Sequence, residues 1–342
     1  MTLAEKPKVL VFGAGAVGST VGGWLAERYP DVWLLDVPPL VEKLRERGLT
    51  LYLGGDKAHS TTVKVQAASD LGDVPAPDVV IVAVKTYSLD KVCGLLKDKL
   101  DDAPLILALQ NGVDNQTILP KYFSKVVYGV VSYNAWIDEP GVVGYQKKGP
   151  LVIGTPDGRL GDETRRLALL LSRGVETVVT EQFQDAAYSK MVINLTNSLQ
   201  ALIGHPMKPI GDRALFQNVL THLVWEGVQI AKAAGHRECR LGGMPSWKLM
   251  WAAANLPAFL TRGAFEKNVK KMVISSMAQD VLQRGGGDSE LETLNGHFLK
   301  LADQHKLAVP YNRAVYKLCK ERFGKELPPI GIEEVWAAVS RS

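Results

Sequence analysis

Three glycines near the amino terminus constrain the fold more than any other feature of the sequence. Gly13, Gly15 and Gly18 follow an apolar run, KVLVFG, and precede a stretch of helical periodicity that continues to Arg28. In a strand–turn–helix unit, this G-x-G-x-x-G spacing assigns one glycine to the tight turn, one to the close approach of a pyrophosphate and one to helix–strand packing. The phosphates would lie at the helix amino terminus, where unpaired N–H groups and the helix dipole favour anions. The alternative is a turn that merely requires small residues. We predict a dinucleotide-binding loop formed by Gly13, Ala14, Gly15, Ala16, Val17 and Gly18.

An acidic residue stands at the end of the next apolar run. Asp36 closes VWLLD (32–36), about 20 residues after the first glycine, where an acidic side chain hydrogen-bonds the adenosine ribose in NAD enzymes. A 2′-phosphate in that place would meet the carboxylate charge at close range, so the residue favours NADH over NADPH. The alternative is that Asp36 only caps a helix beginning near Pro38, because Asp is a preferred N-cap residue.

The first half of the chain alternates short β-branched runs with helix-like segments as far as Thr180. Such alternation predicts a largely parallel sheet covered by helices. The segment GYQKKGPLVIGT (144–155) reads as a hairpin at the edge of this domain. After about Glu181 the strand signal fades, and apolar residues recur at helical intervals. We therefore predict an α/β protein with a Rossmann-type parallel-sheet domain over residues 1–180 and an all-helical domain over 181–342, with a ligand cleft between the two domains.

Composition and charge exclude several classes of protein. The chain has 342 residues, 46% hydrophobic and 22% charged, which is enough for two domains with sizeable cores. No apolar run approaches the roughly 18 residues of a membrane span, and the beginning, MTLAEKPK, lacks the apolar segment of a signal peptide. A net charge of +4 with scattered basic residues does not indicate nucleic-acid binding, and three distant cysteines indicate neither disulfides nor a metal site. We expect a cytoplasmic protein with a small-molecule partner, and no nucleic acid, membrane or metal.

The helical half contains few polar residues at positions that packing does not explain. In YSKMVINLTNS, Lys190 and Asn194 stand four residues apart on one face of an otherwise apolar helix. A lysine in such a place can extend its ammonium group to solvent. If it points into a cleft instead, the loss of hydration lowers its pKa and suits it to proton transfer.

Two further segments carry candidate polar residues. In GGGDSELETLNG, Ser289 and Glu292 match a capping box, which would place Glu290 in the first turn of a helix, where the dipole alone favours a carboxylate. In LALQNGVDN, Asn111 follows a strand, at the edge where open parallel sheets bind ligands.

Six segments, in this order along the chain, resemble the ketopantoate reductase family, the 2-dehydropantoate 2-reductases. They are GAGAVG, VAVKTYSL around Lys85, QNGV (110–113), KMVIN (190–194), SSMAQD (275–280) and SELETLNG (289–296). The resemblance implies NADPH-dependent reduction of a 2-keto acid, 2-dehydropantoate to pantoate, in pantothenate and coenzyme A biosynthesis. It also implies a Rossmann domain followed by a helical domain.

The resemblance implies roles for individual residues. Lys190 matches the catalytic lysine, Asn194 a substrate-binding neighbour, and Ser276 and Glu290 the serine and the carboxylate that contact the substrate. Lys85 and Asn111 fall where the family contacts the cofactor and lines the active site. We assign Lys190 and Glu290 to catalysis.

One departure leaves the substrate open. Where the family's lysine helix commonly reads K-x-x-x-N-x-x-x-N-P, this chain has Ser198 and Leu199 at the last two positions. Ser198 is therefore a candidate substrate-binding residue. A dehydrogenase of another 2-keto or 3-hydroxy acid, and a non-catalytic NAD(P)-binding redox sensor, remain alternatives.

Other conspicuous residues fit structural roles. Trp247 and Trp251 suit packing within the helical domain or a homodimer contact better than stacking on a base. His205, beside Pro206, is an isolated histidine that is more typical of local structure than of the cleft border.

Overall fold

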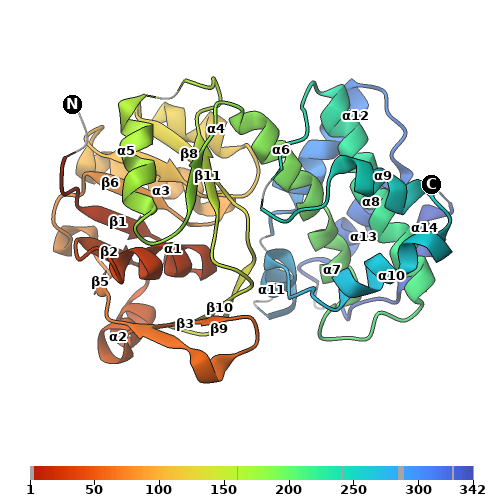
Figure 1. Ribbon diagram of the computed structural model, residues 1–342, viewed down its shortest axis with the longest axis horizontal. Helices are drawn as coiled ribbons and strands as arrows, with labels where there is room; N and C mark the ends of the chain where they lie inside the picture. The colour runs from red at the N-terminus through yellow and green to blue at the C-terminus, as the bar shows by residue number, and fades with distance from the viewer. Residues whose placement is uncertain (1–3, 160, 241, 284–288, 326, 342) are drawn as a thin grey trace. The chain divides into compact units, whose positions relative to one another are not determined.

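The computed structural model describes residues 4–159, 161–240, 242–283, 289–325 and 327–341. The chain divides into two compact units, Met1–Gln184 and Asp185–Ser342, here called the amino-terminal unit and the helical unit (Figure 1). Each unit is described by itself.

The amino-terminal unit is organised by an eight-stranded sheet with the order β12-β11-β8-β7-β6-β1-β2-β5. All neighbouring strands are parallel except β8 and β11. The central strands are buried along their whole length, which explains why they are continuous apolar runs rather than alternating ones. Their bounds are β1 Val9–Phe12, β2 Val32–Leu35, β5 Gln66–Ala68, β6 Val79–Val82, β7 Leu105–Ala108, β8 Val126–Val131, β11 Leu151–Gly154 and β12 Thr177–Val179.

Helices connect these strands, as expected for parallel neighbours. The α-helices of this unit are α1 Ala16–Ala26, α2 Pro38–Arg47, α3 Thr86–Leu100, α4 Asn115–Ile118 and α5 Asp162–Leu171, and short 3₁₀ turns are η1 Lys57–His59, η2 Leu71–Asp73 and η3 Leu119–Lys121. The predicted parallel-sheet domain is confirmed.

A second, four-stranded sheet was not predicted. Its order is β4-β3-β10-β9, and α1 packs against both sheets. Its strands are β3 Leu49–Leu53, β4 Thr61–Val63, β9 Ala135–Glu139 and β10 Val142–Tyr145. The hairpin predicted over 144–155 is therefore wrong, because β10 pairs with β3 and β9 whereas β11 pairs with β8 and β12. Local composition marks both runs as strands, but only their distant partners decide the sheet to which each belongs.

The helical unit contains α6 Phe183–Asn194, which begins just before the unit boundary, and the elements that follow it. These are α7 Thr196–Ile203, α8 Arg213–Ala233, α9 Trp247–Asn255, α10 Ala258–Val269, α11 Ser276–Gln283, the π-helical turn η4 Glu292–Gly296, α12 His297–Gln304, α13 Pro310–Arg322 and α14 Ile332–Val339. The long helix α8 packs against α7, α9, α10, α12, α13 and α14. The all-helical prediction is confirmed, and no helix within the described residues is long and apolar enough to cross a bilayer.

Two side chains show how the helical unit is held together. The Asp212 carboxylate caps α8 by accepting from the N–H groups of Ala214 and Leu215 at 2.8 and 3.0 Å. The Glu226 carboxylate, buried in α8, accepts from the N–H groups of Tyr311 and Asn312 at 3.0 and 2.8 Å, and so binds the start of α13. Burial raises the pKa of Glu226, against the opposing effect of these hydrogen bonds.

Candidate active site

The glycine loop has two positions that only glycine can occupy. Gly13 has φ +98°, and a Cβ atom there would lie 2.9 Å from Val84 Cγ1. A Cβ atom at Gly18 would lie 1.8 Å from the carbonyl oxygen of Gly13. These two glycines are therefore required by the turn and by close packing, as the spacing predicts.

The middle glycine is required by neither constraint. A Cβ atom at Gly15 would meet nothing within 4 Å, and Gly15 is the N-cap residue of α1. The space beside it opens at a helix amino terminus, where backbone N–H groups and the helix dipole favour an anion. The loop thus has the shape and the chemistry that a pyrophosphate needs.

Asp36 is bound to this loop. Its carboxylate accepts from the N–H of Ala14 at 2.6 Å and from the N–H of Val37 at 2.7 Å. The N-cap residue of α2 is Val37, without a side-chain cap, so the alternative in which Asp36 caps that helix is wrong. A carboxylate has about four acceptor sites, and two backbone bonds leave others for hydroxyl groups.

Lys85 and Asn111 follow strands that neighbour β1. Lys85 is the N-cap residue of α3, just after β6, and Asn111 comes after β7. Since β1, β6 and β7 are adjacent and parallel, both residues lie at the same sheet edge as the glycine loop.

Gln110 joins these two segments, and the sequence analysis did not single it out. Its amide donates to the carbonyl oxygens of Val82 and Val84 at 2.7 and 3.1 Å, and Thr86 Oγ1 approaches the carbonyl of Asn111 at 3.4 Å. The QNGV segment contains Gln110, but nothing in its spacing indicates that the side chain turns back to the preceding strand.

In the helical unit, Lys190 and Asn194 lie on the last turns of α6. Lys190 is half-buried and Asn194 is buried. The helix is interrupted at Leu195, and α7 begins at Thr196. The segment YSKMVINLTNS therefore spans two helices.

Two long-range hydrogen bonds bring the other candidate segments to this interruption. Asn295 Nδ2 donates to Ser198 Oγ at 3.0 Å, and Ser275 Oγ donates to the carbonyl of Asn197 at 3.5 Å. Ser275 Oγ also accepts from the N–H of Ala278 at 3.1 Å, which places Ser276 at the start of α11. The segments SSMAQD and SELETLNG thus both adjoin α7, the helix that directly follows KMVIN.

The segment around Glu290 differs from the predicted capping box. Leu291, not Ser289, is the N-cap residue of η4, and Glu292 accepts instead from Tyr316 Oη at 2.8 Å and Lys320 Nζ at 2.8 Å. Burial alone would raise the pKa of Glu292, but hydrogen bonds from Lys320 and Tyr316 outweigh it and hold that pKa below its usual value. The capping box is therefore wrong, because these partners are distant in the sequence.

Glu290 itself is only 3% exposed, and its carbonyl accepts from Leu294 N and Thr293 Oγ1 at 3.1 and 3.0 Å. A buried carboxylate is not explained by a favourable helix dipole alone, because desolvation of a charge costs more than the dipole returns. The following turn is π-helical, a geometry that is frequent at functional sites.

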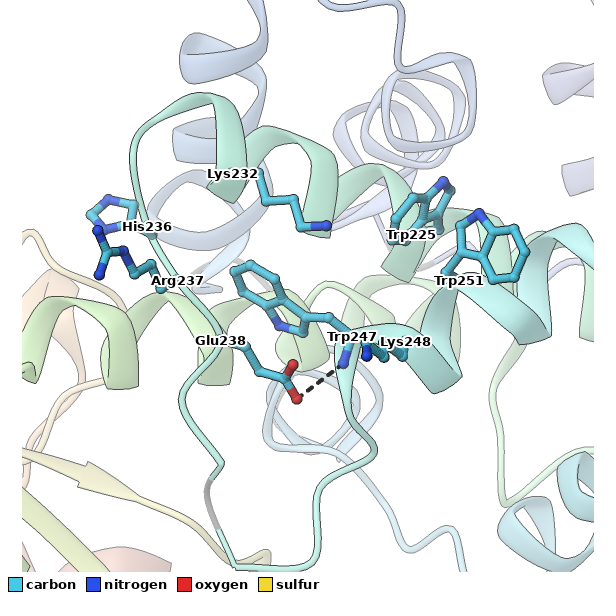
Figure 2. Close-up of a pocket in the computed structure, with 8 residues that line it drawn as sticks. All are labelled: Trp225, Lys232, His236, Arg237, Glu238, Trp247, Lys248 and Trp251. Atoms are coloured by element: carbon cyan, nitrogen blue, oxygen red, sulfur yellow. Dashed lines mark hydrogen bonds between the residues drawn. The ribbon is translucent and has the colours of Figure 1, made fainter.

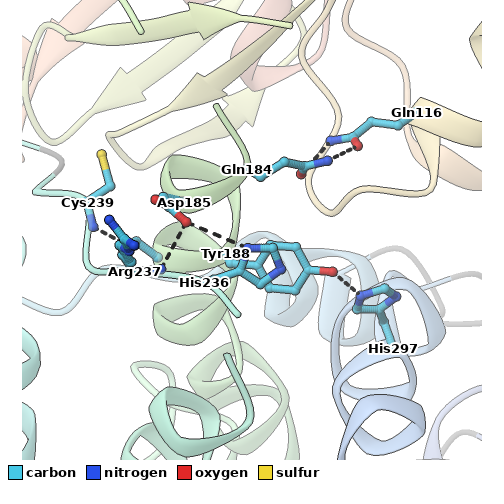
Figure 3. A network of polar contacts seen from close by, with 9 residues as sticks. Gln116, Gln184, Asp185, Tyr188, His236, Arg237, Cys239 and His297 are labelled. Atoms are coloured by element: carbon cyan, nitrogen blue, oxygen red, sulfur yellow. Dashed lines mark hydrogen bonds and ion pairs between the residues drawn. The ribbon is translucent and has the colours of Figure 1, made fainter. Parts of the chain in front are cut away.

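A polar network surrounds the start of α6 (Figure 3). The Tyr188 ring stacks on His236 with centroids 3.6 Å apart, and Tyr188 Oη lies 2.9 Å from His297 Nε2. The Asp185 carboxylate accepts from the N–H of Arg237, and Ser189 Oγ accepts from the N–H of Cys239, both at 2.9 Å. No sequence motif signals these contacts.

Two remaining expectations concern histidines and metals. Both ring nitrogens of His205 are buried, and burial, together with Arg213, lowers its pKa against the opposing effect of the Lys208 backbone. Among the described residues, no group of three His, Cys, Asp or Glu side chains could hold a metal ion.

Comparison with known proteins gives the family. The model for "Ketopantoate reductase PanE/ApbA" matches residues 9–158, and the model for its C-terminal part matches residues 182–323. A 2-dehydropantoate 2-reductase from Halobacterium salinarum is 30% identical over 318 residues, which are 92% of this chain and 98% of that protein.

Solved structures agree with this assignment. The PanE/ApbA family ketopantoate reductase from Ralstonia eutropha JMP134 is 28% identical, with a TM-score of 0.69 over 92% of this chain and 97% of that one. A D-mandelate dehydrogenase, solved with NADH and anilino(oxo)acetate, shares the fold at 20% identity, with a TM-score of 0.72 over 97% of this chain and 99% of that one. The chain belongs to the ketopantoate reductase family and is a nicotinamide-dependent oxidoreductase.

Proposed function

We propose that the protein reduces 2-dehydropantoate to pantoate with NADH as the preferred cofactor. The observation that carries the proposal is that the Asn295–Ser198 and Ser275–Asn197 hydrogen bonds join SELETLNG and SSMAQD to α7, the helix that directly follows KMVIN. These segments supply a lysine, a buried carboxylate, an asparagine and a serine, which are the groups that a polar keto acid requires.

The reduced nicotinamide supplies a hydride to the keto carbon, and the chain supplies the proton and the charge stabilisation. The Lys190 ammonium stabilises the negative charge that develops on the keto oxygen and then donates a proton to it. Glu290 orients the hydroxyl end of the substrate or the lysine. Asn194 and Ser276 hold the remaining polar groups of the substrate, and Asn111 and Lys85 border the cofactor.

In this proposal Ser198 has a structural role and is not the substrate-binding residue that the sequence suggests. Its hydroxyl is fully buried, donates to the carbonyl of Leu195 at 2.8 Å and accepts from Asn295 at 3.0 Å. Because its donor is used and it has no exposed surface, we infer that Ser198 positions the start of α7 and does not contact the substrate.

The proposed preference for NADH rests on Asp36. Its carboxylate lies against the glycine loop, at the N–H of Ala14, and the residues that follow it, Val37, Pro38 and Pro39, bring no positive charge to balance a 2′-phosphate. The resemblance to the family favours NADPH, so the two lines of argument disagree. We give more weight to the carboxylate, because like charges held at close range cost several kcal/mol.

The direct test is oxidation of NADH and of NADPH by the full-length protein with 2-dehydropantoate, pyruvate, 2-oxobutyrate and phenylglyoxylate. We expect the highest kcat/KM for NADH with 2-dehydropantoate. A keto acid that is better by tenfold or more would identify another substrate. No turnover with any keto acid, despite measurable cofactor binding, would favour the redox-sensor alternative.

A further inference from the structure

A pocket of about 500 Å³ opens on the helical unit at a place that the candidate active site does not use (Figure 2). It lies where the carboxyl-terminal half of α8, the segment that follows it and the start of α9 adjoin. Its lining combines indole rings with charged groups: Trp225, Lys232, His236, Arg237, Glu238, Trp247, Lys248 and Trp251. This volume is in the range of small-molecule sites.

The indole rings supply flat apolar surface. Trp247 is nearly buried, at 5% exposure, whereas Trp251 is 46% exposed. The Lys232 ammonium lies 5.4 Å from the ring centroid of Trp225 and 5.7 Å from that of Trp247, so cation–π contacts hold it beside both rings. The pocket thus places a fixed positive charge next to aromatic faces (Figure 2).

The side chains that line the pocket carry more positive than negative charge. Among the described residues that line the pocket, the positive Lys232, Arg237 and Lys248 are opposed only by Glu238, whose carboxylate already accepts from the N–H of Trp247 at 3.2 Å. Arg240 Nε lies 3.9 Å from the same carboxylate, which offsets its charge further. An anion is therefore favoured here and a cation is not.

We propose that this pocket binds a small aromatic anion, with its flat ring on the indoles and its phosphate or carboxylate at Lys232 and Lys248. A bare inorganic anion would leave the indole surface unused, and a neutral ring would leave the positive charges unpaired. Stacking on aromatic side chains and pairing with ammonium groups together require both parts of the ligand.

One wall of the pocket is joined to the helix of Lys190. The backbone N–H groups of Arg237 and Cys239 donate to Asp185 and Ser189, and His236 stacks on Tyr188 (Figure 3). These three partners lie on α6 within two turns before Lys190. A ligand in the pocket therefore acts on the position of α6. That this changes catalysis rests on the function proposed above, in which Lys190 of α6 is the proton donor.

Calorimetric titration of the full-length protein with 1-naphthyl phosphate tests the binding. We expect one site per chain, with binding at least tenfold weaker for inorganic phosphate and for 1-naphthol, and titration with 1-naphthoate distinguishes phosphate from carboxylate ligands. Lys232→Gln and Trp251→Ala should each weaken binding at least tenfold. Lys267→Gln, an exposed lysine of α10 outside the pocket, is the matched control and should not change it.

Several results would overturn the proposal. The proposal is wrong if neither naphthyl anion binds, or if the control variant loses binding as much as Lys232→Gln does. It is also wrong if saturating NADH displaces the anion, because the ligand would then lie at the glycine loop. If Trp251→Ala converts a dimer to a monomer in light scattering without weakening naphthyl phosphate binding, the surface belongs to a second copy of the chain.

Kinetics test the link to α6 separately. Saturating 1-naphthyl phosphate should change kcat/KM for the keto acid at least threefold in the native protein and leave it unchanged in Lys232→Gln. Binding without a kinetic effect would overturn the link and retain the pocket. Absence of reductase activity would overturn the proposed function and leave the calorimetric result standing.

Discussion

The glycine loop and the candidate substrate segments achieve their geometry in opposite ways. The loop spans Gly13 to Gly18, and two of its three glycines meet constraints within the loop: Gly13 has a positive φ, and Gly18 packs against the Gly13 carbonyl. The substrate segments depend on hydrogen bonds that join residues 78 and 97 positions apart. A constraint that acts within a loop produces a residue spacing that can be recognised in the sequence. A cluster built from distant segments appears in the sequence only as separate polar residues, and the sequence does not show which of them come together.

The largest effect is expected at Lys190. Lys190→Ala should lower kcat by roughly 10²–10⁴, because a positioned proton donor is lost, with little change in the Kd for NADH. Glu290→Gln should give a smaller loss of kcat/KM with an unchanged Tm. Steady-state kinetics, fluorescence titration of NADH and thermal unfolding measure these quantities, with Lys267→Ala as the control. Turnover within a few-fold of the native value would show that Lys190 only extends to solvent.

The next largest effect concerns cofactor choice. Asp36→Arg should shift the ratio of kcat/KM for NADPH over NADH by about 100-fold toward NADPH, since charge repulsion worth several kcal/mol is replaced by attraction. The control is Asp31→Arg, at an exposed position before β2. A native preference for NADPH that the substitution leaves unchanged would show that Asp36 does not face the ribose.

A matched pair of glycine variants separates folding from binding within the loop. Gly18→Ala should lower the free energy of unfolding by about 1–3 kcal/mol or more, because the added carbon meets the Gly13 carbonyl. Gly15→Ala should change it by less than about 0.5 kcal/mol but weaken NADH binding, because its methyl group projects into open space. Denaturant unfolding and calorimetry provide both values. If both variants changed the unfolding free energy and the NADH affinity to the same extent, separate roles for Gly18 in folding and Gly15 in binding would be refuted.

Asn295→Leu tests the assembled cluster. It removes the donor to Ser198 Oγ inside the core, and we expect a loss of about 1–3 kcal/mol in unfolding free energy. KM for the keto acid should rise while the Kd for NADH stays the same. Asn255→Leu, at the exposed end of α9, is the control. An unchanged KM in a folded Asn295→Leu protein would separate this hydrogen bond from the substrate site.

The smallest expected effect is a pH dependence of the helical unit. Burial lowers the pKa of His205 below its ordinary 6.5. The folded protein therefore binds fewer protons at this residue than the unfolded chain, and its contribution to stability is present above pH 6.5 and lost as the pH falls through the lowered value. Unfolding in urea between pH 7.5 and 5 should show this decline, and His205→Gln should reduce its slope. An identical slope in the variant would assign the decline to other groups, among them His236, whose pKa burial also lowers.

Prediction from the sequence succeeded where neighbouring residues decide the conformation. The glycine loop, the buried parallel strands and the all-helical second half follow from spacing and periodicity. The hairpin over 144–155 and the capping box at Ser289 and Glu292 were wrong for a common reason. In both, a locally suitable pattern was overruled by distant partners, β3 and β8 for the strands and Tyr316 and Lys320 for the carboxylate.

Residue spacing was enough to locate the glycine turn, because the positive φ of Gly13 and the contact of Gly18 with the Gly13 carbonyl act within a few residues, and glycine satisfies both. Spacing also marked Asp36, but the folded chain decides that its carboxylate binds Ala14 and does not cap α2. The tertiary structure likewise decided that Ser198 meets Asn295 and that Glu290 is buried. Hydrogen bonding and burial depend on which surfaces the folded chain brings together, and that information is not contained in the spacing of residues along it.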